Sequence, residues 1–101
     1  MRYGLKDSIL ESIISIFARY SKIEKVLLYG SRAKGNFKNG SDIDLTLVGN
    51  DIDIKDLNKI YLELDELYLP YSFDISIFDK IQNKDLINHI NRVGIEIYER
   101  E

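Results

Sequence analysis

Hydrophobic and polar residues alternate with a period of two in several short segments of the chain. The apolar run Lys25–Tyr29 is stopped by Gly30, a pattern typical of a strand buried on both faces. Over 42–47 and 72–77, apolar residues alternate with polar ones, and aspartates lie among the polar positions. The sequence therefore predicts strands at all these places, two of which carry carboxylates on one face.

Apolar residues recur at helical spacing in two longer segments. The spacing predicts an amphipathic helix over about 8–20, where Ser8 and Glu11 have the separation of a capping box. It predicts a second helix over about 57–68, which Pro70 stops. Both helices should bury one apolar face against the strands.

The remaining segments complete the expected order of elements. The residues 30–40 are rich in Gly, Asn, Lys and Ser and are expected to form a loop, with a short helical turn opening at Ser31. A last helix is expected near 83–92, and 95–98 is expected to form a short edge strand. We therefore expect one α+β domain spanning 1–101.

Composition limits the classes of protein that fit. The chain has 101 residues, 45% of them hydrophobic, and a formal net charge of -3, which together exclude a multidomain or disordered protein. The absence of cysteine excludes a disulfide framework, a thiolate nucleophile and Cys-rich metal sites, so a metal would need oxygen ligands or His89. The longest apolar run, Val26–Tyr29, is far shorter than a membrane helix. We expect a cytoplasmic protein with no membrane partner, and the scattered basic residues do not favour nucleic acid.

One stretch concentrates the candidate chemistry. Gly30 lets the backbone leave the strand closely, and Ser31 offers a hydroxyl and an N–H where anions are favoured, so this pair predicts a phosphate cradle. Asp42 and Asp44 project from the same side of their strand, and their four oxygens suit Mg²⁺. If the strand over 72–77 lies beside them, Asp74 adds a third carboxylate. Two such ions would support phosphoryl or nucleotidyl transfer.

The spacing of these residues resembles a known family. Gly30-Ser31, ten intervening residues and Asp42-x-Asp44 resemble the minimal nucleotidyltransferase branch of the DNA polymerase β-like nucleotidyltransferase superfamily. The resemblance implies the polymerase β-like fold, a small mixed β-sheet packed with helices. It also implies that Asp42 and Asp44 bind two Mg²⁺ ions, while Asp74 shares one ion and helps to deprotonate the acceptor. Gly30 and Ser31 would hold the triphosphate of ATP.

The resemblance also implies a partner. Minimal members of this family look like antitoxins paired with a HEPN-domain ribonuclease toxin, and some transfer AMP from ATP to a toxin tyrosine. We therefore expect a protein adenylyltransferase that works in a hetero-oligomer. The alternative is a binding module that neutralises its partner by covering the partner's active site, with the nucleotide pocket idle or used for sensing. A third hypothesis, a polymerase-like enzyme, is opposed by the charge balance and by the lack of a template-binding domain.

Simpler interpretations of the carboxylates stand beside these. Asp42 and Asp44 alone could form the wet face of a half-exposed strand. Asp74 could be a solvated residue or a partner for Lys25. Gly30–Ser31 could simply make the turn that ends a strand. The spacing between the glycine-serine pair and the two aspartates favours the functional interpretation.

Several other residues are assigned from their positions. Arg32 is expected to contact phosphate, whereas Lys34 is expected to be a solvated loop residue. His89 lies near the end of the last predicted helix, where a positive charge suits the helix dipole, so a structural role is expected. Tyr61 and Tyr68 are expected on the buried face of the second helix.

Overall fold

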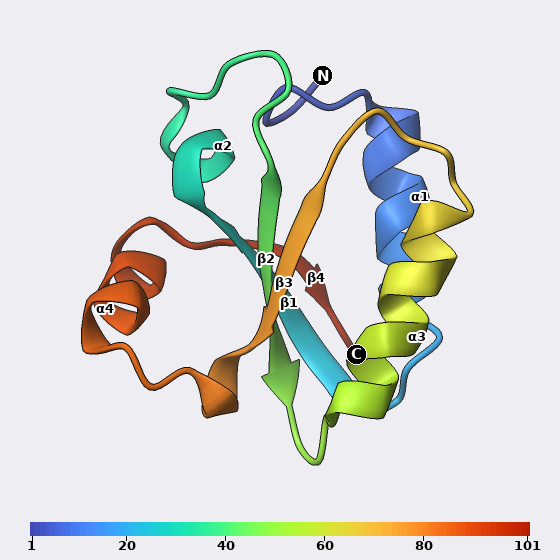
Figure 1. The fold of residues 1–101 in the computed structure, drawn as a ribbon, viewed down its shortest axis with the longest axis vertical. Coiled ribbons are helices and arrows are strands. Elements are labelled where there is room, and N and C mark those ends of the chain that lie inside the picture. Colours follow the sequence, from blue (N-terminus) through green and yellow to red (C-terminus); the bar gives the residue numbers. More distant parts are fainter.

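A four-stranded mixed sheet forms the centre of the molecule. The computed structural model describes residues 1–101, and its strands are arranged in the order β3-β2-β1-β4 (Figure 1). The strand bounds are β1 Ile23–Tyr29, β2 Ile43–Gly49, β3 Phe73–Ile77 and β4 Ile95–Glu99. β1 pairs antiparallel with β2 and β4, whereas β2 and β3 run parallel. The expected α+β class is confirmed, and β4 is the predicted edge strand.

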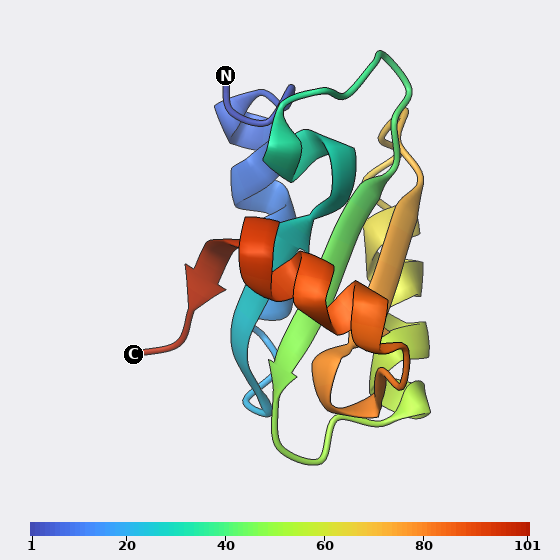
Figure 2. The same cartoon turned by 90° about the vertical axis from the view of Figure 1, so that its left-hand side faces the viewer.

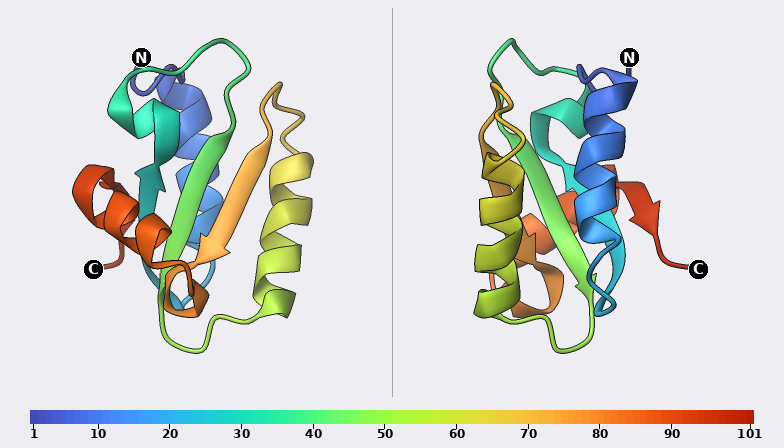
Figure 3. Two further views of the ribbon diagram at one scale, coloured as in Figure 1. Left: turned by 60° about the vertical axis from the view of Figure 1, so that its left-hand side comes forward. Right: turned by 90° about the vertical axis from the view of Figure 1, so that its right-hand side faces the viewer.

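Helices cover both faces of this sheet. Their bounds are α1 Asp7–Phe17, α2 Gly30–Lys34, α3 Ile54–Asp65 and α4 Lys84–Val93, with a 3-10 turn η1 at Phe78–Lys80. α1 and α3 lie on one face, and α2 and α4 lie on the other (Figures 2 and 3). The longest, α3, has 12 residues, and none of these helices has the length and apolarity that crossing a bilayer requires. The sheet is therefore the middle of three layers, with α1 and α3 on one side and α2 and α4 on the other.

The hydrophobic core lies between the sheet and the α1–α3 layer. Alternate strand residues point into it, and they meet the apolar stripes of the two helices. Its fully buried members include Val26, Leu28, Leu45 and Leu47 from the strands and Ile13, Phe17, Ile60 and Leu64 from the helices. Because the period is two, the intervening residues of β1, β2 and β3 face α2 and α4. The polar residues predicted from the alternation therefore share the second face.

The helix ends correct two sequence-based predictions. α1 begins at Asp7 without a side-chain cap, and Ser8 lies inside it, so the predicted capping box is wrong. The capping box forms instead at α3, where Asp53 accepts a hydrogen bond from the N–H of Asp56 (3.0 Å) and the Asp56 carboxylate accepts one from the N–H of Asp53 (3.1 Å). Tyr68 follows the end of α3 with a positive φ and is 91% exposed, so its predicted burial is also wrong.

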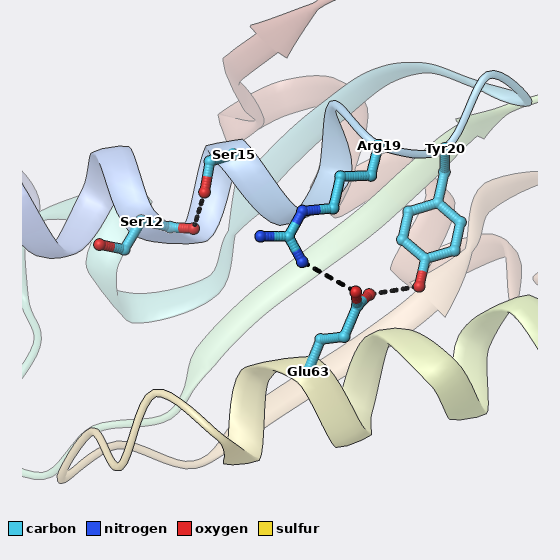
Figure 4. A network of polar contacts seen from close by, with 5 residues as sticks. All are labelled: Ser12, Ser15, Arg19, Tyr20 and Glu63. Carbon is cyan, nitrogen blue, oxygen red and sulfur yellow. Dashed lines mark hydrogen bonds and ion pairs between the residues drawn. The ribbon is translucent and has the colours of Figure 1, made fainter.

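A polar contact ties the C-terminal end of α1 to α3 (Figure 4). The Glu63 carboxylate accepts hydrogen bonds from Arg19 Nη1 (2.9 Å) and from the Tyr20 hydroxyl. Burial, aided by Glu63, raises the pKa of Tyr20 to about 12, so this phenol remains a donor across the physiological range. This contact fixes the two core helices relative to each other and lies on the layer away from the candidate site.

Candidate active site

The register of the sheet brings two of the predicted carboxylates together. β2 and β3 are parallel neighbours, and Asp44 and Asp74 are direct partners in their ladder. Partners in adjacent strands point to the same side of a sheet, and the next residues, Leu45 and Ile75, lie in the core, so both carboxylates point to the opposite face. That face carries α2 and α4 (Figure 2). Asp42 immediately precedes β2. The expectation that the third strand lies beside the second is confirmed.

The three carboxylates influence one another electrostatically. Asp44 is half-buried, and both Asp42 and Asp74 are exposed. Burial raises the pKa of Asp44 above its ordinary value, the negative charges of Asp74 and Asp42 raise it further, and Arg32 opposes this rise. The ionised form of Asp44 is therefore disfavoured within the chain alone, and a bound cation would favour it.

The carboxylate oxygens of the site are suitable ligands for a hard divalent cation, but they are not arranged as a complete coordination site. Carboxylate oxygens are the ligands that Mg²⁺ takes in proteins. No group of three or more His, Cys, Asp or Glu side chains is already placed to hold a metal ion. The adjacency of Asp44 and Asp74 and the raised pKa of Asp44 are the observations that fit a cation there. The role of Asp42, Asp44 and Asp74 as ligands of two ions remains a prediction.

Hydroxyl groups continue the polar face next to the carboxylates. Tyr29 is the register partner of Asp44 on the other side of β2. Burial raises the pKa of the Tyr29 phenol, and the charges of Asp74 and Asp44 raise it further. Ser76 Oγ donates to Thr46 Oγ1 (2.9 Å) on the same two strands as the carboxylates. Next to the two carboxylates, this face therefore carries hydroxyl groups that can donate and accept hydrogen bonds.

The glycine corner packs directly against Asp44. Gly30 follows β1 and opens α2 with a φ of +74°. A Cβ at this position would lie 2.2 Å from Asp44 Oδ2, so only glycine allows the backbone this close to the carboxylate. Ser31 follows in the first turn of α2 and is half-buried. The structure thus places the predicted phosphate cradle beside the predicted metal ligands.

Arg32 does not take the position that the sequence suggests. Its side chain is only 3% exposed; Nε (3.2 Å) and Nη2 (2.8 Å) donate to the Ser41 carbonyl, and Nη1 donates to the Tyr3 carbonyl (2.9 Å). The guanidinium carbon lies 5.2 Å from the ring centre of Phe37 and 5.0 Å from that of Tyr71. These contacts leave little surface for a ligand, so the predicted phosphate contact is replaced by a structural role. Arg32 holds the loop that leads into Asp42.

His89 is the residue of this region that sequence reasoning missed. Its Nε2 accepts a hydrogen bond from the Gly30 N–H (3.2 Å), and its ring stands edge-on to Tyr29 with centroids 6.1 Å apart. The sequence predicted that His89 interacts with the dipole of its own helix, and this prediction does not account for the contact with Gly30. His89 and Gly30 are 59 positions apart, and no local motif joins them. The one available signal was that His89 is the single histidine of the chain.

Two further expectations can be compared with the structure. Lys25 lies 3.7 Å from both Glu96 and Glu99, so it pairs with β4, and the alternative in which it partners Asp74 is wrong. Lys34 is exposed at the end of α2, in agreement with its assignment as a solvated residue.

Neither cavity of the molecule is lined by Asp44 or Asp74. The larger, about 530 Å³, lies at the other end of β2 and is lined by Lys22, Gly49, Asp51, Ile52, Asp53, Ile77, Asp79 and Lys80. The smaller, about 230 Å³, lies beside Arg32 and Tyr71. Asp42 and Asp74 are exposed, so the carboxylates lie at an open part of this face, where a second molecule could approach them.

The sequence of the chain is similar to those of known proteins. Residues 11–101 match the family model described as polymerase beta, nucleotidyltransferase, a span that includes every predicted site residue. A Methanocaldococcus jannaschii protein with a provisional protein adenylyltransferase name is 28% identical over 79 residues, which is 75% of this chain and 80% of that protein.

Solved structures share the fold at lower identity. A toxin–antitoxin crystal structure with AMP-PNP is similar with a TM-score of 0.75 and 18% identity over 91% of this chain and 74% of the other. A tri-AMPylated Shewanella oneidensis HEPN toxin in complex with MNT antitoxin gives a TM-score of 0.70 and 15% identity over 95% and 74%. A Sulfolobus solfataricus protein described as a nucleotidyltransferase gives 0.51 and 20% over 96% and 92%.

Proposed function

The chain belongs to the polymerase β nucleotidyltransferase family, and from that premise we propose that it moves AMP from ATP to a hydroxyl of a partner protein. The observation that carries this proposal is the pairing of Asp44 with Asp74 directly against the Gly30 corner. The acceptor we propose is a tyrosine of a HEPN-domain toxin, which this chain would neutralise as an antitoxin. The relatives named for adenylyl transfer and for toxin–antitoxin complexes support this choice.

The residues divide the chemistry among them. Asp42 and Asp44 would hold Mg²⁺, which supplies charge neutralisation at the phosphates when bound. The Gly30–Ser31 backbone and the Ser31 hydroxyl would hold the triphosphate. The acceptor oxygen attacks the α-phosphorus and forms a new P–O bond, while the bond to the bridging oxygen breaks and pyrophosphate leaves. Asp74 accepts the proton that the acceptor hydroxyl gives up.

The open face supports a protein acceptor. Asp74 is exposed at the β3 edge of the sheet, and neither cavity is lined by the paired carboxylates. A side chain projecting from a partner surface can therefore reach Asp74 without entering a deep pocket. The partner would also supply the wall that excludes water from the reacting phosphate.

Labelled transfer tests the proposal. The chain is incubated with ATP labelled at the α-phosphate, Mg²⁺ and the protein encoded beside its gene, and the partner's label is measured. We expect label on the partner with wild type and with the control Lys34→Ala, and none with Asp44→Asn. A partner that stays unlabelled with either Mg²⁺ or Mn²⁺, while it binds the chain, would contradict the proposal.

A binding module is the second candidate, and α3 offers the observation that favours it. Ile54 and Leu62 are 61% and 64% exposed on this helix, and a partner that covered them would remove this apolar surface from water. Such a module should neutralise its partner with Asp42 and Asp44 both replaced by alanine. Loss of neutralisation in that double variant, with partner binding retained, would exclude it.

A further inference from the structure

Helix α4 reaches the glycine corner through one side chain. His89 projects from α4 onto the junction between β1 and α2, where Nε2 lies 3.2 Å from the Gly30 nitrogen. The His89 and Tyr29 rings meet at an angle of 81°. Figure 2 shows α4 crossing the face of the sheet below α2. A helix far along the chain therefore contacts the backbone at the point where the triphosphate is proposed to bind.

The hydrogen bond fixes the chemical form of the imidazole. Because Nε2 accepts the hydrogen bond from the Gly30 N–H, a proton on the ring in this arrangement lies on Nδ1. Gly30 opens α2, and the first N–H groups of a helix have no carbonyl partner in the helix itself. His89 thus supplies an acceptor that α2 cannot provide.

The Gly30 peptide is constrained from two sides. The Asp44 carboxylate occupies the space where a Cβ would lie, and the imidazole of His89 holds the N–H. The φ of Gly30 is +74°, which is only one of the many backbone conformations open to a glycine without such contacts. The two contacts favour this conformation and so help to order the backbone that leads into Ser31.

We propose that His89 is a positioning residue of the nucleotide site, which orders the Gly30–Ser31 backbone for the triphosphate through its bond to the Gly30 N–H. This inference rests on the proposed function, because the triphosphate is its ligand. It assigns a role in ATP affinity to a residue outside the glycine-serine and aspartate motif. His89 acts through Gly30 and needs no contact with the nucleotide.

Substitutions that separate the acceptor from the bulk of the ring test this role. His89→Leu preserves the approximate size of the side chain but removes the hydrogen-bond acceptor. His89→Gln introduces an amide oxygen that can accept from the same N–H. Asn88→Ala, on an exposed neighbouring position of α4, is the matched control. We expect His89→Leu to raise the KM for ATP by about five- to tenfold, the effect of one lost hydrogen bond, with little change in kcat.

Rescue distinguishes positioning from mere support of the fold. His89→Gln should recover most of the ATP affinity, and Asn88→Ala should match wild type. A structural role would instead lower the active fraction, and with it kcat, in proportion to lost thermal stability. A lower KM in His89→Leu would mean that the imidazole blocks the nucleotide, and it would overturn the proposal.

A readout without turnover separates this inference from the proposed function. Calorimetry gives the dissociation constant for AMP-PNP with Mg²⁺, and NMR gives the shift and hydrogen exchange of the Gly30 amide in each variant. His89→Leu should weaken binding and speed Gly30 exchange, and His89→Gln should reverse both. Unchanged binding in His89→Leu overturns the inference alone. A wild type that binds the analogue but transfers no AMP contradicts the proposed function alone, and a wild type that binds no nucleotide overturns both.

Discussion

The two ends of β2 carry the same kind of residue in opposite electrostatic conditions. At its beginning, burial and neighbouring carboxylates raise the pKa of Asp44. Beyond its end, the backbone N–H of Asp56 lowers the pKa of Asp53. Asp53 and Asp56, which follow β2, have partners within the chain. They form the capping box of α3, and Asp56 also makes an ion pair with Lys22 (3.2 Å). The acidic residues at the beginning of β2 lack such partners, so a cation from outside would stabilise their negative charges.

Cavity size alone would favour the other end of the strand. The 530 Å³ cavity lies beside Asp53 and Lys22, where carboxylates already serve α3. The open face beside Asp44 has no cavity of its own, but it brings together a glycine corner, like charges and a raised pKa. We therefore base the proposed site on the raised pKa of Asp44 and the close approach of the Gly30 backbone.

The largest effect should come from Asp44→Asn. We expect AMP transfer to fall by more than about a hundredfold, because the amide removes the charge that would hold the cation. In the metal-free protein the same change should stabilise the fold by ~1 kcal/mol, since it removes a half-buried charge among like charges. Thermal unfolding and labelled transfer measure the two effects. Retained transfer, or a less stable variant, would contradict the assignment of Asp44.

Gly30→Ala should have the next largest effect, and Gly35→Ala is its matched control. Both glycines have positive φ, at +74° and +86°, so alanine costs about 1–2 kcal/mol at either position. Only at Gly30 would the added Cβ meet Asp44 Oδ2, whereas nothing lies within 4 Å at Gly35. We expect Gly30→Ala to destabilise more, by about 2–4 kcal/mol in all, and to lose ATP binding. Equal denaturant midpoints for Gly30→Ala and Gly35→Ala would show that the close approach of Gly30 to Asp44 does not affect stability.

At the other end of β2, Asp53→Ala should affect stability without affecting transfer. The variant loses the acceptor for the Asp56 N–H at the start of α3, so its thermal midpoint should fall by a few degrees. Because this carboxylate serves the helix, the rate of AMP transfer by the folded protein should equal that of wild type. Slower AMP transfer by folded Asp53→Ala would contradict the assignment of stability to one end of β2 and of catalysis to the other.

The smallest effect is a difference in pH dependence. Asp44 has a folded pKa above its ordinary value of 3.8, so its ionisation costs stability as the pH rises through and above that value. Asp53 has a folded pKa below 3.8, so its contribution is present above that pH and is lost as the pH falls towards the folded value. The advantage of Asp44→Asn should therefore vanish in acid and grow towards neutrality without metal. Thermal midpoints between pH 3 and pH 7 test the sign, and an advantage that is larger in acid would refute it.

The strands and their polar face could be predicted because the signal is local. Alternation with a period of two located 43–47 and 73–77, and it also placed Asp44 and Asp74 opposite the core. The corner at Gly30 followed from where an apolar run stops. These predictions needed only the neighbours of each residue in sequence.

The errors arose where a side chain could turn in more than one direction or where the contact was distant. Arg32 stands next to Ser31 in sequence, but its guanidinium turns towards Tyr3 and Ser41, which no spacing rule specifies. The spacing of Ser8 and Glu11 is that of a capping box, yet the N-cap of the helix is Lys6, two residues before Ser8. The role of His89 depends on how α4 crosses the sheet, a property of the packed fold.

Calorimetric titration of ATP into the chain with and without Mg²⁺ tests the central claim most directly. We expect binding heat for wild type with Mg²⁺, and for Asp53→Ala as well, because only the beginning of β2 is proposed to bind the nucleotide. We expect no heat without Mg²⁺ and none for Asp44→Asn. Binding that is independent of Mg²⁺, or equal in wild type and Asp44→Asn, would contradict this claim.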